Sequence, residues 1–218
     1  MLASLKNKDT YRHYFKTLRF ALYILTHPLD GYWDLTHEKR GSMAAANTLT
    51  IVALIIYIAR LQFTSFLFMN VYWETLNVFA YAAGVLLPLA LWCVGNWGLT
   101  TLFNGKGRLK QVYMATAYGF TPFIIIQIPA IILSNFVTTE EGAFYMMAFY
   151  ISLLWCAILI VLGMMQIHEY KIGQTIFFTI ATIFSMLVMT FLLLLFFSMF
   201  TQGIAYIISI YKEIMFRM

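Results

Sequence analysis

Charged residues are scarce in this chain, and their scarcity excludes an ordinary soluble domain. Of the 218 residues, 11% are charged and 62% are hydrophobic, whereas soluble domains average about 25% charged and about 45–50% apolar residues. Only two cysteines occur, Cys93 and Cys156, and both lie inside apolar stretches. Their positions favour packed free thiols over a disulfide framework. The composition therefore predicts an integral membrane protein.

Signatures of catalysis are missing as well. The sequence has no HExxH and no GxSxG motif, and no histidine lies within its apolar runs to activate a buried nucleophile. Those runs also lack aspartate and glutamate, the side chains that usually couple transport to protons. We therefore expect no enzymatic activity, no cofactor and no metal centre.

Most of the chain consists of five apolar runs, at residues 43–61, 76–103, 111–135, 143–167 and 174–200. Each provides the roughly 20 residues that an α-helix needs to cross a bilayer core about 30 Å thick. We expect an all-α fold, a polytopic bundle of five transmembrane helices over residues 43–200. A cytoplasmic segment (1–42) precedes this bundle and an amphipathic tail (201–218) follows it, each with an interfacial helix. The second run is long enough to contain a break near Pro88 or Gly95.

The distribution of Lys and Arg predicts how the bundle is inserted. Seven of the 14 cations lie in residues 1–42, three in 104–110, and one, Lys171, after the fourth run. These segments share one side in a five-span topology, and by the positive-inside rule that side is cytoplasmic. The N-terminus is then cytoplasmic and the C-terminus outside, in what we take to be a bacterial cytoplasmic membrane. Cations confined to helix ends also argue against a nucleic-acid partner.

Both ends of the chain have the pattern of helices that lie on a membrane surface. Over residues 11–25 the apolar residues form one helical stripe, which consists of Tyr11, Tyr14, Phe15, Leu18, Leu22 and Leu25. Arg12, Lys16 and Arg19 share another face. Such a helix can bind an anionic leaflet of the membrane. Its apolar stripe can also pack on the bundle, and the sequence does not decide between these two roles. After Gly203 the tail repeats the pattern with Ile204, Ile207, Ile208, Tyr211 and Met215.

The segment just before the first span, residues 27–42, is dense in polar and aromatic side chains. Its two central aromatic residues are expected to anchor it at the membrane interface. One of its acids would cap a short helix, and the cations that follow would contact phosphates. The predicted partner-binding or membrane-surface site consists of Asp30, Tyr32, Trp33, Asp34, Lys39, Arg40 and Arg108.

A metal site is the alternative use of the same segment. If residues 29–40 are helical, Asp30, Asp34 and His37 lie on one face, with His27 close by. Oxygen and imidazole ligands on adjacent turns can hold a divalent transition metal. Neighbouring bases make ion pairs the simpler role for these acids, so we assign none of them as a metal ligand.

Four segments resemble those of a known membrane-protein family. They are the stretch 27–42, the loop 104–108, the Tyr-Gly…Pro pattern of residues 115–122, and residues 140–144. Over about residues 20–200 the chain resembles the Yip domain family, five-span proteins first named for interacting with Ypt/Rab GTPases. It looks closest to the bacterial branch. The resemblance implies a cytoplasmic N-terminus and a five-helix bundle.

The resemblance also implies partners rather than a reaction. Eukaryotic members are trafficking adaptors that bind prenylated GTPases through a long cytoplasmic N-terminal region. Only about 40 residues precede the first span here, which argues against Rab GTPase binding. Some bacterial relatives accompany solute-uptake transporters, so ABC-type transporter permeases join the lipid bilayer and other integral membrane proteins as expected partners.

Polar side chains inside the apolar runs are informative, because lipid destabilises each of them unless it is paired or wet. Tyr118, Pro122 and Gln127 in the third run could line an intramembrane site, as in a small transporter, channel or lipid-moving protein. Their other role is packing, with interhelical hydrogen bonds of about 0.6–2 kcal/mol each. Arg60 is expected to snorkel to the outer surface and pair with Glu74. We favour packing, and with it a non-enzymatic membrane scaffold or accessory subunit.

The predicted topology can be tested with single cysteines and a membrane-impermeant thiol reagent in intact cells. Cysteines at Lys106 and Lys171 should be shielded because both loops are cytoplasmic, whereas those at Thr139 and Lys212 should react. Permeabilised cells, in which every site is accessible, provide the control. Labelling at Lys106 in intact cells would contradict the five-span topology.

Overall fold

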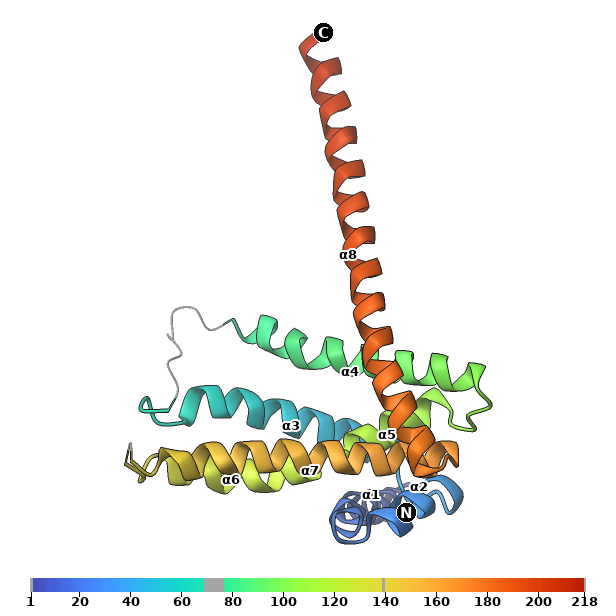
Figure 1. Cartoon of the computed structure of the whole chain (residues 1–218), viewed down its shortest axis with the longest axis vertical. Coiled ribbons are helices and arrows are strands. Elements are labelled where there is room, and N and C mark those ends of the chain that lie inside the picture. Colours follow the sequence, from blue (N-terminus) through green and yellow to red (C-terminus); the bar gives the residue numbers. More distant parts are fainter. Residues whose placement is uncertain (1, 69–76, 139, 218) are drawn as a thin grey trace.

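The computed structural model describes residues 2–68, 77–138 and 140–217, and this part of the chain is built from helices (Figure 1). A hairpin of α1 (Leu2–Thr26) and α2 (Pro28–His37) precedes the membrane helices. The membrane helices are α3 (Met43–Phe63), α4 (Val78–Leu102), α5 (Leu109–Gly119), α6 (Thr121–Ser134), α7 (Gly142–His168) and α8 (Ile172–Arg217).

Five stretches of helix are long and apolar enough to cross a membrane, namely α3, α4, α5 together with α6, α7, and α8. The predicted all-α architecture with five candidate spans is therefore confirmed. α4 continues through Pro88 and Gly95, so the second apolar run forms one helix without the break that its length could have contained.

The third apolar run is divided between α5 and α6 at Phe120. Pro122 is the second residue of α6 and has no N–H, so it cannot donate to the carbonyl of Tyr118 one turn earlier. The hydroxyl of Thr121 donates to that carbonyl instead, at 2.6 Å. The division therefore has a local cause, the Thr-Pro pair at the start of α6.

α8 is a single helix of 46 residues. Its N-terminal part packs against α4 and α7, and the remainder rises away from the other helices (Figure 1). A separate interfacial helix was expected after Gly203, but α8 continues through this glycine to Arg217. One glycine destabilises a helix by about 1 kcal/mol. That is too little to open backbone hydrogen bonds in an apolar stretch where water cannot replace them.

α1 packs on the bundle with a different face from the predicted stripe. Its buried residues are Thr17, Phe20, Ala21 and Ile24. Three members of the predicted stripe are instead exposed, namely Tyr11, Phe15 and Leu22. The stripe therefore lies beside the contact with the bundle rather than in the middle of it.

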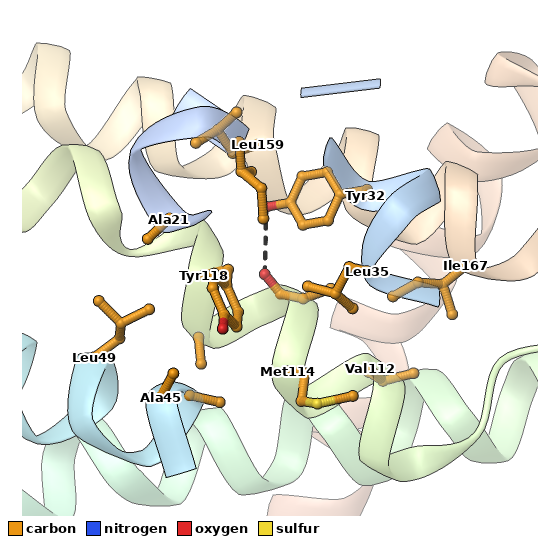
Figure 2. Packing of buried hydrophobic residues seen from close by; sticks show 14 of the residues in the cluster. Ala21, Tyr32, Leu35, Ala45, Leu49, Val112, Met114, Tyr118, Leu159 and Ile167 are labelled. Atoms are coloured by element: carbon orange, nitrogen blue, oxygen red, sulfur yellow. Dashed lines mark hydrogen bonds between the residues drawn. The ribbon is translucent and has the colours of Figure 1, made fainter. Parts of the chain in front are cut away.

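The main core lies where the α1–α2 hairpin meets α3, α5 and α7. Tyr32 of α2 is fully buried there, and its hydroxyl donates to the carbonyl of Ala115 at 3.3 Å (Figure 2). The ring lies against Gly163 of α7, where a Cβ atom would come within 3.0 Å of two ring carbons. A Cβ atom at this position would require the ring to move by a few tenths of an ångström, so the glycine favours this close approach.

Replacement of Tyr32 tests whether this contact holds the hairpin on the bundle. Tyr32→Ala should lower the free energy of unfolding by about 3–5 kcal/mol, because it leaves a cavity the size of an aromatic ring. Tyr32→Phe keeps the ring and should lose only about 1 kcal/mol with the hydrogen bond. Thermal unfolding of the full chain in mild detergent measures both, with Trp33→Ala as the control at an exposed neighbour. A wild-type melting temperature for Tyr32→Ala would contradict the assignment.

Candidate partner-binding surface

α2 begins and ends with local signals. Pro28 occupies its first turn, where a missing N–H is harmless. His27 is the N-cap residue and its side chain makes no capping bond, so the expectation that Asp30 or Asp34 caps this helix is wrong. Asp30 lies in the first turn, where a carboxylate interacts favourably with the helix dipole. The helix ends before Lys39, which has a positive φ of 53°.

Two stacked rings form an aromatic plate on the exposed face of α2. The centroids of Trp33 and His37 are 3.6 Å apart, and their planes are 17° from parallel. The imidazole Nδ1 also lies 2.9 Å from the hydroxyl of Thr36 and 3.2 Å from the carbonyl of Trp33. Trp33 is nevertheless 46% exposed. A fixed aromatic side chain of this kind is typical of binding hot spots.

Tyr32 is not part of this surface, contrary to the prediction that it anchors the segment at the membrane interface. It is fully buried, and burial raises the pKa of its hydroxyl well above the usual range. Successive residues of a helix point roughly 100° apart, and Trp33 lies on the side of α2 that the bundle leaves exposed. The glycine at position 163 of α7 provides the space that accepts Tyr32.

The cations that follow α2 have different environments. Arg40 pairs with Asp34 (Nη1 to Oδ2, 2.8 Å) and with Glu38 (Nε to Oε2, 2.8 Å). Its guanidinium is therefore engaged within the chain, whereas a phosphate contact was expected. Lys39 and Arg108 are exposed. We define the α2 surface as the exposed residues Asp30, Trp33, His37, Lys39 and Arg40 together with the half-buried Asp34, the ion-pair partner of Arg40.

Glu169, the residue after α7, lies next to the α2 surface and pairs with the loop before α5. The Glu169 carboxylate lies 2.5 Å from Lys106 Nζ and 4.0 Å from His37 Nε2. The end of α7 and the loop before α5 therefore border the same surface. Within the described residues, no three His, Cys, Asp or Glu side chains come together as a metal site.

Tyr118, Pro122 and Gln127 are all buried. The Tyr118 hydroxyl donates to the carbonyl of Thr17 at 3.0 Å, which joins α5 to α1. Gln127 Nε2 donates to the hydroxyl of Ser152 at 2.9 Å, which joins α6 to α7. Pro122 lies at the start of α6. These contacts describe packing between helices.

Two adjoining apolar cavities lie beside the third span, and other residues line them. One has a volume of about 450 Å³ and the other about 220 Å³, and Val85 and Phe120 line both. The larger also contains the hydroxyl of Thr116, which accepts from Trp92 Nε1 at 3.2 Å, and that of Thr179, which has no partner. Such a lining suits a hydrocarbon chain better than a polar solute.

Arg60 is buried, so the prediction that it snorkels to the outer surface is wrong. It is only 7% exposed. Its Nε donates to the hydroxyl of Tyr145 at 2.9 Å, and its guanidinium carbon lies 3.6 Å from the ring centroid of Phe149. The predicted partner, Glu74, lies outside the described residues. Tyr145 and Phe149 are four residues apart and therefore lie on one face of α7. This spacing is the feature of the sequence that could have indicated an aromatic site for Arg60.

A second polar cluster holds the loop before α5 against the membrane helices. The amide of Gly107 donates to His168 Nδ1 at 3.3 Å, so the proton of a neutral imidazole belongs on Nε2. That atom lies 3.1 Å from the Asn96 carbonyl oxygen, and Asn96 Nδ2 donates to Thr182 at 3.2 Å. The cluster therefore connects α4, α7 and α8 through one chain of hydrogen bonds.

Comparison with known proteins gives one finding. The family model of the Yip1 domain matches residues 22–211, a range that includes α2, the first four candidate spans and most of the fifth. No curated protein and no solved structure matches the chain.

The buried position of Arg60 can be tested by removing the Tyr145 hydroxyl, which accepts its hydrogen bond. Tyr145→Phe keeps the ring and leaves the buried Nε of Arg60 without its acceptor, which should lower the free energy of unfolding by about 1–3 kcal/mol. Tyr150→Phe is the matched control, because this tyrosine lies on the same helix and is 65% exposed. Melting temperatures of the two variants in the same detergent give the comparison. Equal stability would show that the Tyr145 hydroxyl does not support Arg60.

Proposed function

Because the chain belongs to the Yip1 domain family of integral membrane proteins, we propose that it is a non-enzymatic membrane scaffold or accessory subunit. The family is in general a non-catalytic one. In this role the chain associates with other integral membrane proteins of a bacterial cytoplasmic membrane, and ABC-type transporter permeases are among the candidates. The charge distribution supports a cytoplasmic N-terminus and an outer C-terminus.

The observation that carries this proposal is the exposure of α8. Every residue from 190 to 216 is exposed. The helix has no charged residue between Lys171 and Lys212, so the exposed surface of this part is mostly apolar, with a few uncharged polar residues such as Ser198 and Gln202. A surface of this size and character is typical of a site that binds lipid or another apolar helix. Since the chain's own bundle leaves it uncovered, a partner within the membrane would find it available.

The α2 surface provides a second contact outside the apolar layer. Trp33 is held by its stacked partner His37, and Asp34 is held by Arg40. Side chains that are fixed before binding lose less conformational entropy when a partner arrives. This surface would therefore add specificity to an association that the apolar helices support.

The apolar cavities beside Phe120 favour a second candidate function, the binding or movement of lipid chains. The combined lining is almost free of polar groups, which fits acyl chains and does not favour a small polar solute. One preparation separates the two functions. Native mass spectrometry of protein purified in mild detergent would show a stoichiometric membrane-protein partner or second copy for a scaffold, and retained lipid alone for the second candidate.

The scaffold proposal predicts that Trp33→Ala weakens association with the co-purified partner at least tenfold, a loss of about 1.4 kcal/mol. The reason is the loss of the aromatic anchor on the α2 surface, with no change in the core. Trp155→Ala is the matched control, because Trp155 is equally exposed (47%) but lies on α7. Quantitative co-purification at equal expression measures the effect. A monodisperse single chain without any stoichiometric partner would refute the scaffold role.

A further inference from the structure

α1 is tied to the bundle by hydrogen bonds that define how it is turned. The hydroxyl of Thr17 lies 3.1 Å from that of Ser42, the N-cap residue of α3. The hydroxyl of Tyr14 lies 2.7 Å from that of Thr48, six residues further along α3. α1 is seen nearly end-on in Figure 1, whereas α3, α6 and α7 run across the view, so α1 lies crosswise to these spans.

These two contacts show which side of α1 faces the membrane interior. α3 begins at Met43 and runs into an apolar span, so Thr48 lies deeper in the membrane than Ser42. The Tyr14 side of α1 is therefore the deeper side, and the Thr17 side faces the bundle near the membrane surface.

The exposed apolar residues of α1 follow on this deeper side. At 3.6 residues per turn, side chains three, four and seven positions apart lie on neighbouring positions of one helical face. These residues are Tyr11, Phe15 and Leu22, which are 59%, 63% and 52% exposed. They extend from the Tyr14 side away from the bundle, toward the hydrocarbon that surrounds α3.

The cations of α1 lie opposite Tyr14 and beside the exposed apolar residues, with Arg19 about 40° around the helix from Phe15. Arg12, Lys16 and Arg19 are spaced by four and three residues, which places them about half a turn away from Tyr14. All three are exposed, and none makes an ion pair with a residue that the structure describes. Their charges therefore point away from the membrane interior, at the level where phospholipid headgroups lie.

We propose that α1 is an in-plane lipid-binding helix that recognises anionic phospholipid. Arg12, Lys16 and Arg19 bind the headgroup phosphates, and the apolar residues insert among the upper parts of the acyl chains. The negative charge of the leaflet complements the cations. The cations lie at the level of the headgroups and the apolar residues lie deeper, among the acyl chains. This binding site is separate from the α2 surface and does not depend on a protein partner.

The test uses the full chain reconstituted in vesicles of phosphatidylcholine, with or without one part in four of phosphatidylglycerol. An environment-sensitive fluorophore is attached at Phe15→Cys after Cys93 and Cys156 have been replaced by alanine. Quenching by a lipid spin-labelled just below its headgroup reports whether this side of α1 lies in the leaflet. We expect strong quenching in the anionic vesicles. Lys16→Gln combined with Arg19→Gln should reduce it at least twofold, and so should high salt with the unsubstituted helix.

The matched control is Lys110→Gln combined with Lys171→Gln, which removes the same charge from exposed positions outside α1 and should leave the quenching unchanged. Equal quenching in both lipid mixtures, unaffected by the α1 substitutions, would overturn recognition of anionic lipid. Absence of quenching in either mixture would show that Phe15 faces protein or water, and would overturn the proposal as a whole. If the control substitutions reduced the quenching as much as the α1 substitutions do, the effect would come from general surface charge. That result would also overturn the proposal.

Discussion

A polar side chain within a hydrocarbon layer has to find its hydrogen-bond partner inside the protein, because lipid supplies none. The arrangement of this bundle follows from that constraint. Gln127 with Ser152 joins α6 to α7, and Asn96 with Thr182 joins α4 to α8. Each such bond contributes only about 0.6–2 kcal/mol, yet each also fixes the position of one helix along another. A shift of either helix by one turn would separate the amide of Gln127 or Asn96 from the hydroxyl that accepts its hydrogen bond.

The number and position of the membrane helices could be predicted from the sequence, because each span needs its own unbroken apolar run. Whether a helix is divided or continuous within an apolar run was harder to predict from the sequence. The Thr121-Pro122 pair divides the third run, since the proline removes one donor and the threonine replaces it. Gly203 leaves α8 intact, because a glycine weakens a helix without removing any backbone donor. Pro122 removes a backbone donor and Gly203 does not, although α4 shows at Pro88 that a helix can also continue through a proline.

Which residues of the candidate site face outward could not be predicted, because distant contacts decide it. Tyr32 and Trp33 are adjacent, aromatic and equally suited to a membrane interface. Tyr32 enters the core because α7 has a glycine at position 163 that lets the ring approach, and no local pattern in the α2 segment indicates this. Arg60 is a similar case. Counting residues placed it at the end of a span, and its buried slot depends on Tyr145 and Phe149, more than 80 positions further along the chain.

The same constraint explains which surfaces the proposed scaffold role would use. Hydrogen bonds occupy most of the buried polar side-chain atoms of the bundle, with Gln127 Oε1 and the Thr179 hydroxyl as exceptions among the described residues, and the uncovered surface of the spans is mostly apolar. α8 shows this most clearly. At about 1.5 Å per residue its 46 residues extend roughly 70 Å, while only its N-terminal part packs against α4 and α7. Apolar side chains cannot discriminate among partners by hydrogen bonding, and polar ones such as Ser198 and Gln202 are few on this helix, so it can supply affinity but little specificity. Specificity then has to come from the charged and aromatic segments at the membrane surface. In this chain those segments are α1 and the α2 surface, which the buried ring of Tyr32 holds against the bundle.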